Sequence, residues 1–297
     1  MGLCKDRRVG RRSLLVAGLQ AAGIPDDPVA TLEAFERQVR ALGSLLDGVQ
    51  LVVAPELHLM ALPPLLEDEG PPEARAVPVP GPLTERLGAL ARETELWLLP
   101  GSVYEQAEEG VYNTALVFSP AGELVTSYRK CFPWQPYETV LPGRRVVAFE
   151  IDGVGKVGLA ICHDGVFPEV VRQLTWEGAE AIVQVSLTPT SDRAVEIVVA
   201  RANAYVNQVF LVNVNAAAPV GNGRSVVVDP EGTVLYEAGA SEEVVTAVVD
   251  FDAVALVRER GAFGLNRMLE QLDRHGSELD LPMYGGRYRP RPDSRPA

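Results

Sequence analysis

The sequence predicts an α/β protein in which helices cover the outer faces of β-sheets. Apolar runs of strand length recur along the chain, and segments with apolar residues at helical spacing lie between them. Some neighbouring runs are joined by tight turns and others by a helix, so both hairpins and crossovers are expected. This combination is typical of sheets that bury apolar surface against helices.

The first half of the chain predicts strands around two helices. Leu32, Phe35 and Val39 fall on one face of the first helix, and Pro82 suits the first turn of the second. The turn SPAG folds the last apolar segment back on itself. In chain order the expected elements are a strand LLVAGLQ, a helix over 28–46, a strand VQLVVAPE, a helix over 82–95, and strands over 95–105 and 110–130.

The second half continues the pattern. A DG turn divides residues 145–162 into two strands, and Ser191 or Asp192 suits the cap of a helix over 191–208. In order we expect those two strands, a helix from Pro168 that ends near Gly178, a strand AEAIVQVS, the helix over 191–208, and strands over 209–218, 223–238 and 242–252.

Composition excludes several classes of partner. The chain has 297 residues, of which 47% are hydrophobic and 23% charged, as in soluble globular proteins. A formal net charge of -13 disfavours nucleic acid or an anionic membrane as the main partner, because both require clustered Lys and Arg. No run approaches the roughly 20 apolar residues of a membrane span. A small-molecule substrate stays compatible with this charge.

The termini are expected to be tails around one domain. Residues 1–13 form a basic segment that either precedes the first strand or acts as a twin-arginine export signal; the apolar run after it is short, which favours a plain tail. We expect a single domain over residues 14–285. Residues 286–297 are rich in Pro and Arg and are expected to form an extended arm.

Cysteine and histidine usage gives no sign of disulfides or metal. Cys4, Cys131 and Cys162 are an odd set without CxxC spacing, and the three histidines are scattered. The sequence therefore predicts no metal, no cofactor and a cytoplasmic, reducing location.

Three chemically capable residues follow three predicted strands. Glu56 ends VQLVVAPE, Lys130 ends GELVTSYRK, and Cys162 ends KVGLAIC. In α/β folds, sites assemble at the carboxyl ends of strands. A thiol can act as nucleophile, a lysine favours the thiolate and stabilises negative charge, and a carboxylate can shuttle the proton. Together they suffice for acyl transfer without histidine or metal.

These blocks carry a family resemblance. VVAPE, YRK and GLAICHDGVFPE resemble the three signature blocks of the nitrilase superfamily, the carbon–nitrogen hydrolases, and the resemblance extends from about Leu14 to about Tyr288. It implies a four-layer α-β-β-α sandwich with a catalytic Glu56, Lys130 and Cys162. It also implies oligomers that pair sandwiches face to face, so we expect a homodimer or a higher homo-oligomer.

The loop after the lysine resembles one branch of that superfamily. KCFPWQPYETVLPG is similar to the corresponding loop of aliphatic amidases and formamidases. The resemblance implies that Glu138 is a second catalytic glutamate, which positions the substrate or Lys130, and that Trp134 walls the acyl pocket. Cys131 neighbours the lysine but ends no buried strand, so we expect Cys162 to be the nucleophile.

Other positions near these blocks differ from relatives or are expected to be structural. His163 follows the nucleophile, and its N–H can serve the oxyanion hole while its side chain either lines the pocket or packs. Leu57, His58 and Thr139 differ from the family pattern and predict a differently shaped pocket. Structural roles are expected for Asp164, Glu169 and Arg172, which would brace the nucleophile turn, and for Asn203, Asn207 and Ser225.

The function expected from this reading is hydrolysis of a small amide. A cysteinyl thioester would form, ammonia would leave, and water would release the carboxylic acid, as in amidase-type enzymes of class EC 3.5.1. Two alternatives use the same three residues, namely a nitrilase and an N-carbamoyl amide hydrolase. A further alternative is a catalytically silent scaffold or binding subunit.

Overall fold

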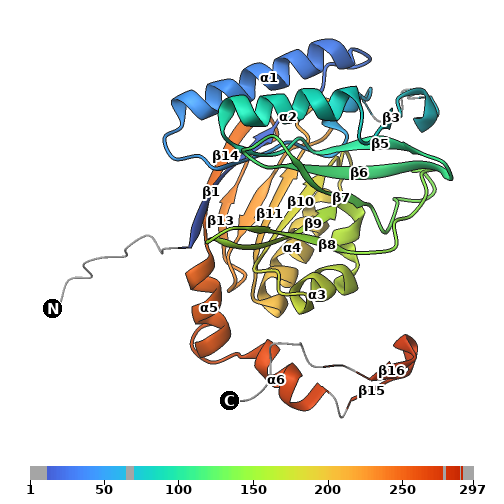
Figure 1. The fold of residues 1–297 in the computed structure, drawn as a ribbon. Coiled ribbons are helices and arrows are strands. Elements are labelled where there is room, and N and C mark those ends of the chain that lie inside the picture. The colour runs from blue at the N-terminus through green and yellow to red at the C-terminus, as the bar shows by residue number, and fades with distance from the viewer. Residues whose placement is uncertain (1–11, 65–69, 277–278, 288, 290–297) are drawn as a thin grey trace.

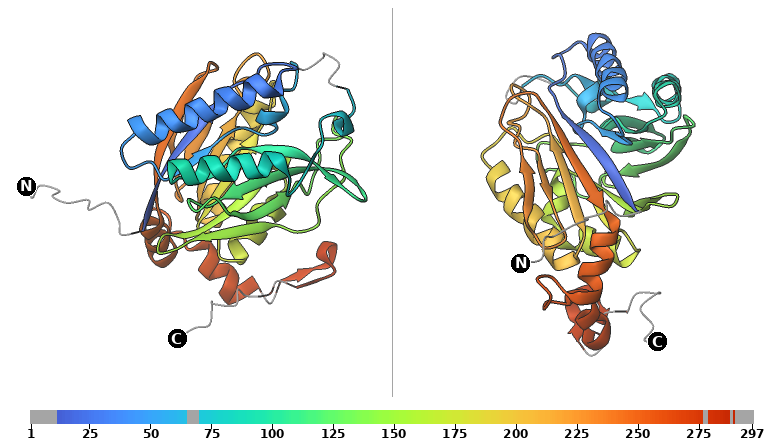
Figure 2. Two further views of the ribbon diagram at one scale, coloured as in Figure 1. Left: turned by 45° about the horizontal axis from the view of Figure 1, so that its top comes forward. Right: turned by 90° about the vertical axis from the view of Figure 1, so that its left-hand side faces the viewer.

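The computed structural model describes residues 12–64, 70–276, 279–287 and 289. The two predicted tails fall largely on residues 1–11 and 290–297, which lie outside the described residues, as does Cys4. Within the described part the chain forms two sheets that face each other, and pairs of helices cover their outer faces (Figure 1). The layers follow the predicted order of helix, sheet, sheet and helix, which Figure 2 shows edge on.

The first sheet is mixed. Its β1, β2 and β4 run parallel, whereas β14 and β6 flank them in antiparallel directions, and β7 pairs with β6 as the predicted hairpin. In sheet order the strands are β14 (Glu243–Asp250), β1 (Ser13–Gln20), β2 (Leu51–Val53), β4 (Trp97–Leu99), β6 (Gly110–Phe118), β5 (Ser102–Ala107) and β3 (Val77–Pro78), with β7 (Leu124–Arg129) beside β6.

The second sheet has a parallel centre with antiparallel edges. Its β9, β10 and β11 run parallel and are joined by helices, as the crossovers predict. In sheet order the strands are β13 (Val234–Glu237), β12 (Val226–Val228), β11 (Phe210–Asn215), β10 (Ala181–Ser186), β9 (Gly155–Ile161) and β8 (Val147–Ile151).

Helices bury both outer faces, which explains the continuous apolar runs of the central strands. In β11, Phe210 and Val212 belong to the core between the sheets, whereas Leu211 belongs to the core under the helices. Side chains alternate between these two apolar layers, so neither face of the strand needs polar residues. The covering helices are α1 (Pro28–Leu45) and α2 (Pro82–Thr94) on the first sheet, and α3 (Pro168–Trp176) and α4 (Arg193–Asn207) on the second.

Two helices beyond the sandwich were not predicted. They are α5 (Phe251–Arg260) and α6 (Met268–His275), which lie at one end of the molecule (Figure 1). Asp250 caps α5, because its side chain accepts hydrogen bonds from the backbone N–H groups of Asp252 and Ala253. The strand predicted over 242–252 therefore ends at Asp250.

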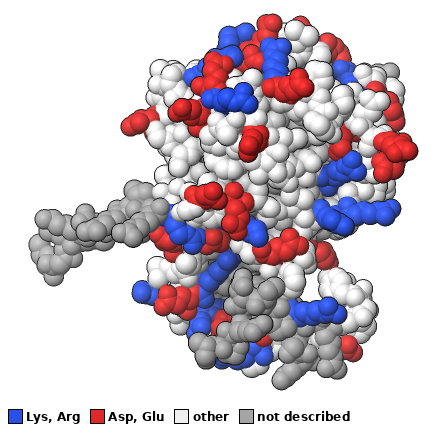
Figure 3. Space-filling view, in the orientation of Figure 1, with Lys and Arg blue, Asp and Glu red and all other residues white. Residues whose placement is uncertain are grey.

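Short elements fill the connections. They are the 3-10 turns η1 (His58–Met60), η2 (Pro72–Ala74), η3 (Cys162–Val166) and η5 (Pro282–Tyr284), and the strand pair β15 (Asp280–Leu281) and β16 (Gly286–Arg287). Among the described residues, no helix has both the length and the apolar character needed to cross a membrane. On the face in Figure 3, acidic and basic side chains lie interspersed.

Candidate active site

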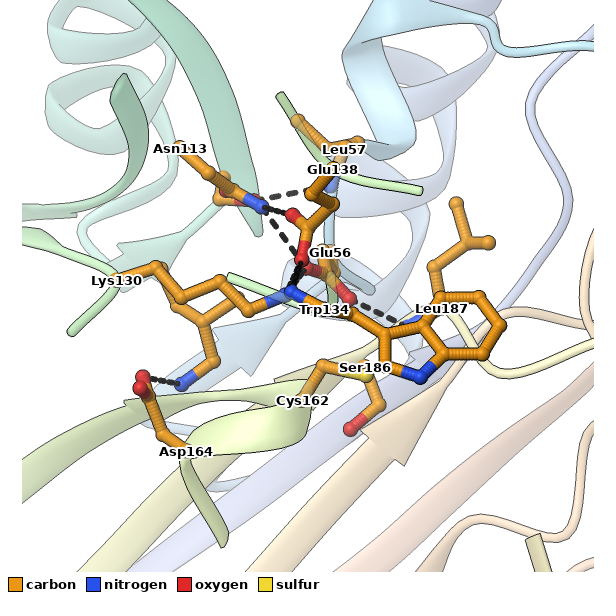
Figure 4. Close-up of polar contacts among 12 residues, drawn as sticks. Glu56, Leu57, Asn113, Lys130, Trp134, Glu138, Cys162, Asp164, Ser186 and Leu187 are labelled. Atoms are coloured by element: carbon orange, nitrogen blue, oxygen red, sulfur yellow. Dashed lines mark hydrogen bonds and ion pairs between the residues drawn. The ribbon is translucent and has the colours of Figure 1, made fainter. Parts of the chain in front are cut away.

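The three residues predicted at strand ends converge. Glu56 follows β2, Lys130 follows β7, and Cys162 follows β9 at the first residue of η3. Figure 4 shows their side chains gathered in one place, with Glu138 and Asn113 above them. Convergence arises because the facing sheets direct these strand ends to the same edge of the sandwich.

Lys130 is held between two carboxylates. Its Nζ donates hydrogen bonds to Oε1 of Glu56 at 2.8 Å and to Oε2 of Glu138 at 2.5 Å, and only 1% of the residue is exposed. Burial alone would lower the pKa of Lys130, but the negative charges of the two glutamates outweigh it and hold the pKa well above its usual value. The ammonium is therefore charged at neutral pH.

Asn113, on β6, joins the same two glutamates and was not predicted to be functional. Its Nδ2 donates to Oε1 of Glu56 at 2.8 Å and to Oε1 of Glu138 at 3.0 Å. The signal that could have found it is the register of the predicted hairpin, in which the backbone N–H of Lys130 donates to the carbonyl of Asn113. Asn113 thus orients both carboxylates around the lysine.

Glu56 is a buried carboxylate with an increased affinity for protons. Its Oε2 accepts a hydrogen bond from the backbone N–H of Leu187 at 2.9 Å, and 3% of the residue is exposed. Burial raises the pKa of Glu56; the charge of Lys130 opposes this effect, and the charge of Glu138 adds to it. Such a group is suited to take up a proton and return it.

Cys162 occupies a sharp strand-to-helix turn. Its backbone has φ +44°, a left-handed conformation that is uncommon outside glycine, and its carbonyl accepts a hydrogen bond from Gln184 at 2.7 Å. Burial raises the pKa of the Cys162 thiol well above its usual value, Glu56 raises it further, and Lys130 lowers it. The expectation that the lysine favours the thiolate is correct in sign, but burial outweighs it, so the resting group is a neutral thiol.

Asp164 connects the nucleophile turn to the segment that carries the lysine. Its Oδ1 accepts the backbone N–H groups of Cys131 at 3.1 Å and Phe132 at 2.9 Å. Its Oδ2 accepts the N–H of Ile161 at 3.0 Å and the hydroxyl of Tyr128 at 2.7 Å. The predicted bracing role of this buried residue is confirmed.

Glu138 also organises its own loop. Its Oε2 accepts the backbone N–H of Trp134 at 2.5 Å, and its N–H donates to the carbonyl of Trp134 at 2.9 Å. The indole of Trp134 stacks on the ring of Tyr137, with 4.7 Å between ring centroids. These contacts fix the loop that the two prolines, Pro133 and Pro136, had marked as non-helical and non-strand.

A cavity of about 230 Å³ lies over Cys162. Trp134 and His163 line it, as the resemblance implied for Trp134, and the remaining wall comes mainly from the start of α4 and the segment before it. The alternatives for His163 both hold, because its ring lines the cavity and also packs edge-on against Phe167 at 5.3 Å. Burial, the largest effect, lowers the pKa of His163, so its ring is neutral at physiological pH.

The change in pocket shape predicted from Leu57, His58 and Thr139 stays a prediction. None of the three lines the cavity. Leu57 has φ +51°, and this left-handed residue turns His58 toward α1, where its ring packs against Phe35 at 5.9 Å. The side chain of Thr139 is exposed.

Cys131 lies apart from Cys162. Its Sγ is 3.6 Å from the carbonyl of Arg145, in a separate surface groove, and its backbone N–H is held by Asp164. Burial raises the pKa of its thiol. The structure therefore brings Cys162, and not Cys131, into the cavity beside Glu56 and Lys130.

The other residues assigned structural roles make hydrogen bonds that join elements. Asn203 donates to the carbonyl of Gly165 in η3 at 2.8 Å, so it also braces the nucleophile turn. Glu169 accepts the hydroxyl of Tyr284, and Arg172 donates to the carbonyl of Val206. Asn207 instead donates to the carbonyl of Asn203 within α4, and the hydroxyl of Ser225 accepts the backbone N–H of Asn215. No group of three His, Cys, Asp or Glu within the described ranges could hold a metal ion.

Fold and site together define a class, the α/β sandwich enzymes that keep a cysteine beside a buried lysine and glutamate. Residues 15–259 match the carbon–nitrogen hydrolase family, and the chain belongs to that family, within the nitrilase superfamily. The match spans the first strand to the end of α5. It confirms the predicted family and fold class.

Relatives with assigned names agree with this membership. Formamidases of Bacillus thuringiensis (strain Al Hakam) and Bacillus cereus (strain AH820) are each 32% identical over 211 residues, which cover 68% of this chain. The match spans 62% of the length of those formamidases.

Solved structures show the same architecture. Saccharomyces cerevisiae Nit3, a member of branch 10 of the nitrilase superfamily, is 26% identical, with a TM-score of 0.74 over 84% of this chain and 94% of Nit3. An amidase from Nesterenkonia sp. is 25% identical, with a TM-score of 0.69 and the same coverage. A mutant of the Nesterenkonia sp. AN1 amidase, also 25% identical, with a TM-score of 0.68 over 80% of this chain and 92% of its own, carries acrylamide added to its active-site cysteine.

Proposed function

We propose that the protein is a thiol hydrolase that cleaves the C–N bond of a small amide, giving the carboxylic acid and ammonia. The observation that carries this proposal is that Cys162, which lines the cavity, lies beside the paired Lys130 and Glu56 (Figure 4). Two comparisons support it, since relatives of this chain are named formamidase and amidase, and one amidase is modified at an active-site cysteine.

In the first half of the reaction Glu56 acts as general base. The thiol of Cys162 is neutral at rest, so its proton must move to Glu56 as the sulfur attacks the amide carbonyl carbon. The oxyanion forms next to the ammonium of Lys130 and the backbone N–H of His163, which stabilise its charge. Glu56 then donates the proton to the departing nitrogen, ammonia leaves, and an acyl thioester with Cys162 remains.

In the second half water replaces the amine. Glu56 takes a proton from water, the resulting hydroxide attacks the thioester carbonyl, and the C–S bond breaks. The proton on Glu56 returns to the sulfur, so the carboxylic acid leaves and the thiol of Cys162 is restored. The proposed reaction steps require no oxidation, reduction or external cofactor.

Glu138 has a supporting role in this proposal. Burial alone would raise the pKa of Glu138, but the charge and the hydrogen bond of Lys130 outweigh it, and the pKa is lowered. Glu138 therefore stays ionised and keeps Lys130 aimed at the place where the oxyanion forms, while Glu56 carries the protons. Trp134 and His163 would contact the acyl group, because both line the cavity.

The test is release of ammonia from a panel of short amides, with the matched nitriles and N-carbamoyl compounds as alternatives. Intact mass spectrometry during turnover should find an acyl adduct, and peptide mapping should place it on Cys162. Ammonia from nitriles but not from amides would contradict amidase activity. Carbon dioxide release from the carbamoyl compounds alone would do the same, and a silent scaffold would form no adduct.

A further inference from the structure

A carboxylate that the proposed reaction does not use lies in the wall of the Cys162 cavity. Glu196, on the first turn of α4, lines this cavity, and 12% of its side chain is exposed. The hydroxyl of Thr188 lies 3.7 Å from Sγ of Cys162 and 2.9 Å from Oε2 of Glu196. One hydroxyl group therefore separates the carboxylate from the nucleophile.

The hydrogen bonds of Glu196 leave part of its accepting capacity unused. Its Oε1 and Oε2 share the single hydroxyl hydrogen of Thr188, and they lie 3.0 Å and 2.9 Å from that hydroxyl oxygen. Oε2 also accepts a hydrogen bond from Nη1 of Arg193 at 3.1 Å. A carboxylate has about four lone-pair sites. Arg193 is itself buried, does not line the cavity, and donates its Nη2 to the carbonyl of Arg224 at 2.7 Å. The carboxylate thus faces the cavity, and its guanidinium partner lies behind it.

The charges around the cavity are predominantly negative. His163 adds no charge, since burial lowers its pKa. Carboxylates outnumber cations among the other groups near Cys162: Glu56, Glu138, Asp192 and Glu196 against Lys130 and Arg193. A group that enters this cavity therefore meets a field that attracts cations.

We propose that Glu196 is a specificity-determining residue that selects amides whose acyl chain ends in a cationic group, such as an ammonium. This inference rests on the proposed amidase function. The short path from Cys162 through Thr188 to Glu196 suits a cation roughly one or two carbon atoms beyond the reacting carbonyl. Leu187, Val195 and Val199 line the same cavity and would contact the methylene groups.

The other classes of acyl group fit this cavity less well. A neutral alkyl chain would remove water from the Glu196 carboxylate without supplying a hydrogen-bond donor, which leaves a charged acceptor unsatisfied. An acyl chain that ends in a carboxylate would meet Glu196 and Asp192 as like charges. Of these three ends, only the cationic one supplies a hydrogen-bond donor, and it adds the attraction of opposite charges to that bond.

The experiment compares three substrates of the wild-type protein that differ at the end of the acyl chain. β-Alaninamide, butyramide and succinamate have the same chain length and end in an ammonium, a methyl and a carboxylate. We expect kcat/KM for β-alaninamide to exceed that for butyramide by about tenfold or more, the range expected of one hydrogen bond between charged groups. We expect succinamate to be the poorest of the three. Equal or better turnover of butyramide by the wild-type protein would overturn the inference.

Variants tie the preference to Glu196. Glu196→Gln keeps the size and an acceptor for Thr188 but removes the charge, and it should reduce the preference for β-alaninamide to near unity. Glu196→Asp keeps the charge and should retain a preference for the cation. Asp47→Asn, a charge removal in the exposed loop after α1, is the matched control and should leave the substrate ratio as in wild type.

A binding measurement separates this inference from the proposed function. In Cys162→Ala, calorimetry with β-alaninamide and butyramide reports cation preference without turnover. One outcome is that the wild-type protein hydrolyses no amide, while Cys162→Ala binds β-alaninamide more tightly than butyramide. This outcome would contradict the amidase proposal and support the role of Glu196. The opposite outcome is that the wild-type protein hydrolyses amides, while Cys162→Ala binds the two ligands equally. It would support the amidase proposal and contradict the role of Glu196.

Discussion

Nζ of Lys130 lies 2.8 Å from Oε1 of Glu56, although 74 residues separate them in the chain, and both side chains are almost fully buried. Removing two charges from water is costly, and the cost is offset only when further partners complete their hydrogen bonds. Glu138 and Asn113 are those partners. The site is thus assembled by folding and does not depend on a substrate to order it.

Removing the cation from this cluster should affect stability as well as activity. Lys130→Met leaves Glu56 and Glu138 buried without a counter-charge, and we expect a loss of about 3–5 kcal/mol in the free energy of unfolding at neutral pH. The loss should shrink at acidic pH, where the carboxylates accept protons. Urea unfolding at two pH values measures both effects. Lys156→Met replaces a half-buried lysine whose Nζ donates to the carbonyl of Glu177; it is the control and should cost about 1 kcal/mol or less.

The assignment of the nucleophile predicts opposite results at two cysteines. Cys162→Ala should lower amide hydrolysis by at least about a thousandfold, the scale seen when a covalent nucleophile is removed. Cys131→Ala should keep most of the activity, because its thiol lies outside the cavity. Steady-state kinetics measures the difference, and circular dichroism checks that both variants fold. Substantial activity in Cys162→Ala would refute the assignment.

The raised pKa of Glu56 predicts the acid side of the pH–rate profile. Burial raises this pKa above 4.5, Lys130 opposes the rise, and Glu138 adds to it. The base must be ionised to accept the thiol proton, so kcat/KM should fall as the pH decreases through a value above 4.5. Glu138→Gln removes the negative charge that adds to this rise and should move the fall in kcat/KM to lower pH, whatever it does to the rate. An unchanged midpoint would argue that another group controls the profile.

Glu56, Lys130 and Cys162 could be predicted because each follows a predicted strand, apolar before Glu56 and Cys162, and α/β topology gathers strand ends. Asn113 was missed, although the register of the predicted hairpin could have found it. Glu196 could not be found, since its place in the cavity wall depends on how α4 packs in the folded protein. Packing between elements cannot be derived from the spacing of apolar residues within one segment. The same limit explains His58, whose direction is decided by the left-handed backbone of Leu57.

The elements of the fold also include some that the sequence predicted and some that it did not. Both helix pairs and the hairpins were predicted from apolar spacing and turn residues, and they are confirmed. The helix α5 was missed because its first residues continue the apolar strand β14, and only the side chain of Asp250 separates the two elements. The expected homo-oligomer and the boundaries of a domain over 14–285 stay predictions.

Asp164 predicts a positioning effect that differs from simple destabilisation. Asp164→Asn places an NH₂ donor against backbone and hydroxyl donors, which should cost about 2–4 kcal/mol of stability. It should also lower kcat with little change in KM, because Asp164 holds the segment after Lys130 against the turn of Cys162. Tyr128→Phe removes one donor only and should cost about 1 kcal/mol with a smaller loss of kcat. Retention of kcat in folded Asp164→Asn would show that this link does not position the site.

His58 predicts a loss of stability in acid that is unrelated to catalysis. Burial lowers the pKa of His58 from 6.5 to about 4, and among the described residues its Nδ1 has no hydrogen-bond partner. The unfolded chain binds the proton below pH 6.5, whereas the folded protein binds it only near pH 4. The contribution of His58 to stability is therefore complete above pH 6.5 and decreases as the pH falls toward 4.

Between about pH 7 and about pH 5 this linkage should cost about 2 kcal/mol in the free energy of unfolding. His58→Gln cannot titrate, so its stability should decline less steeply than that of the wild-type protein over the same interval, whatever its starting value. Urea unfolding at a series of pH values measures the slopes. His275→Gln is the matched control on α6, and its curve should run parallel to wild type because this side chain is exposed in the folded protein. Equal slopes for wild type and His58→Gln would mean that the buried imidazole is not what makes the fold sensitive to acid.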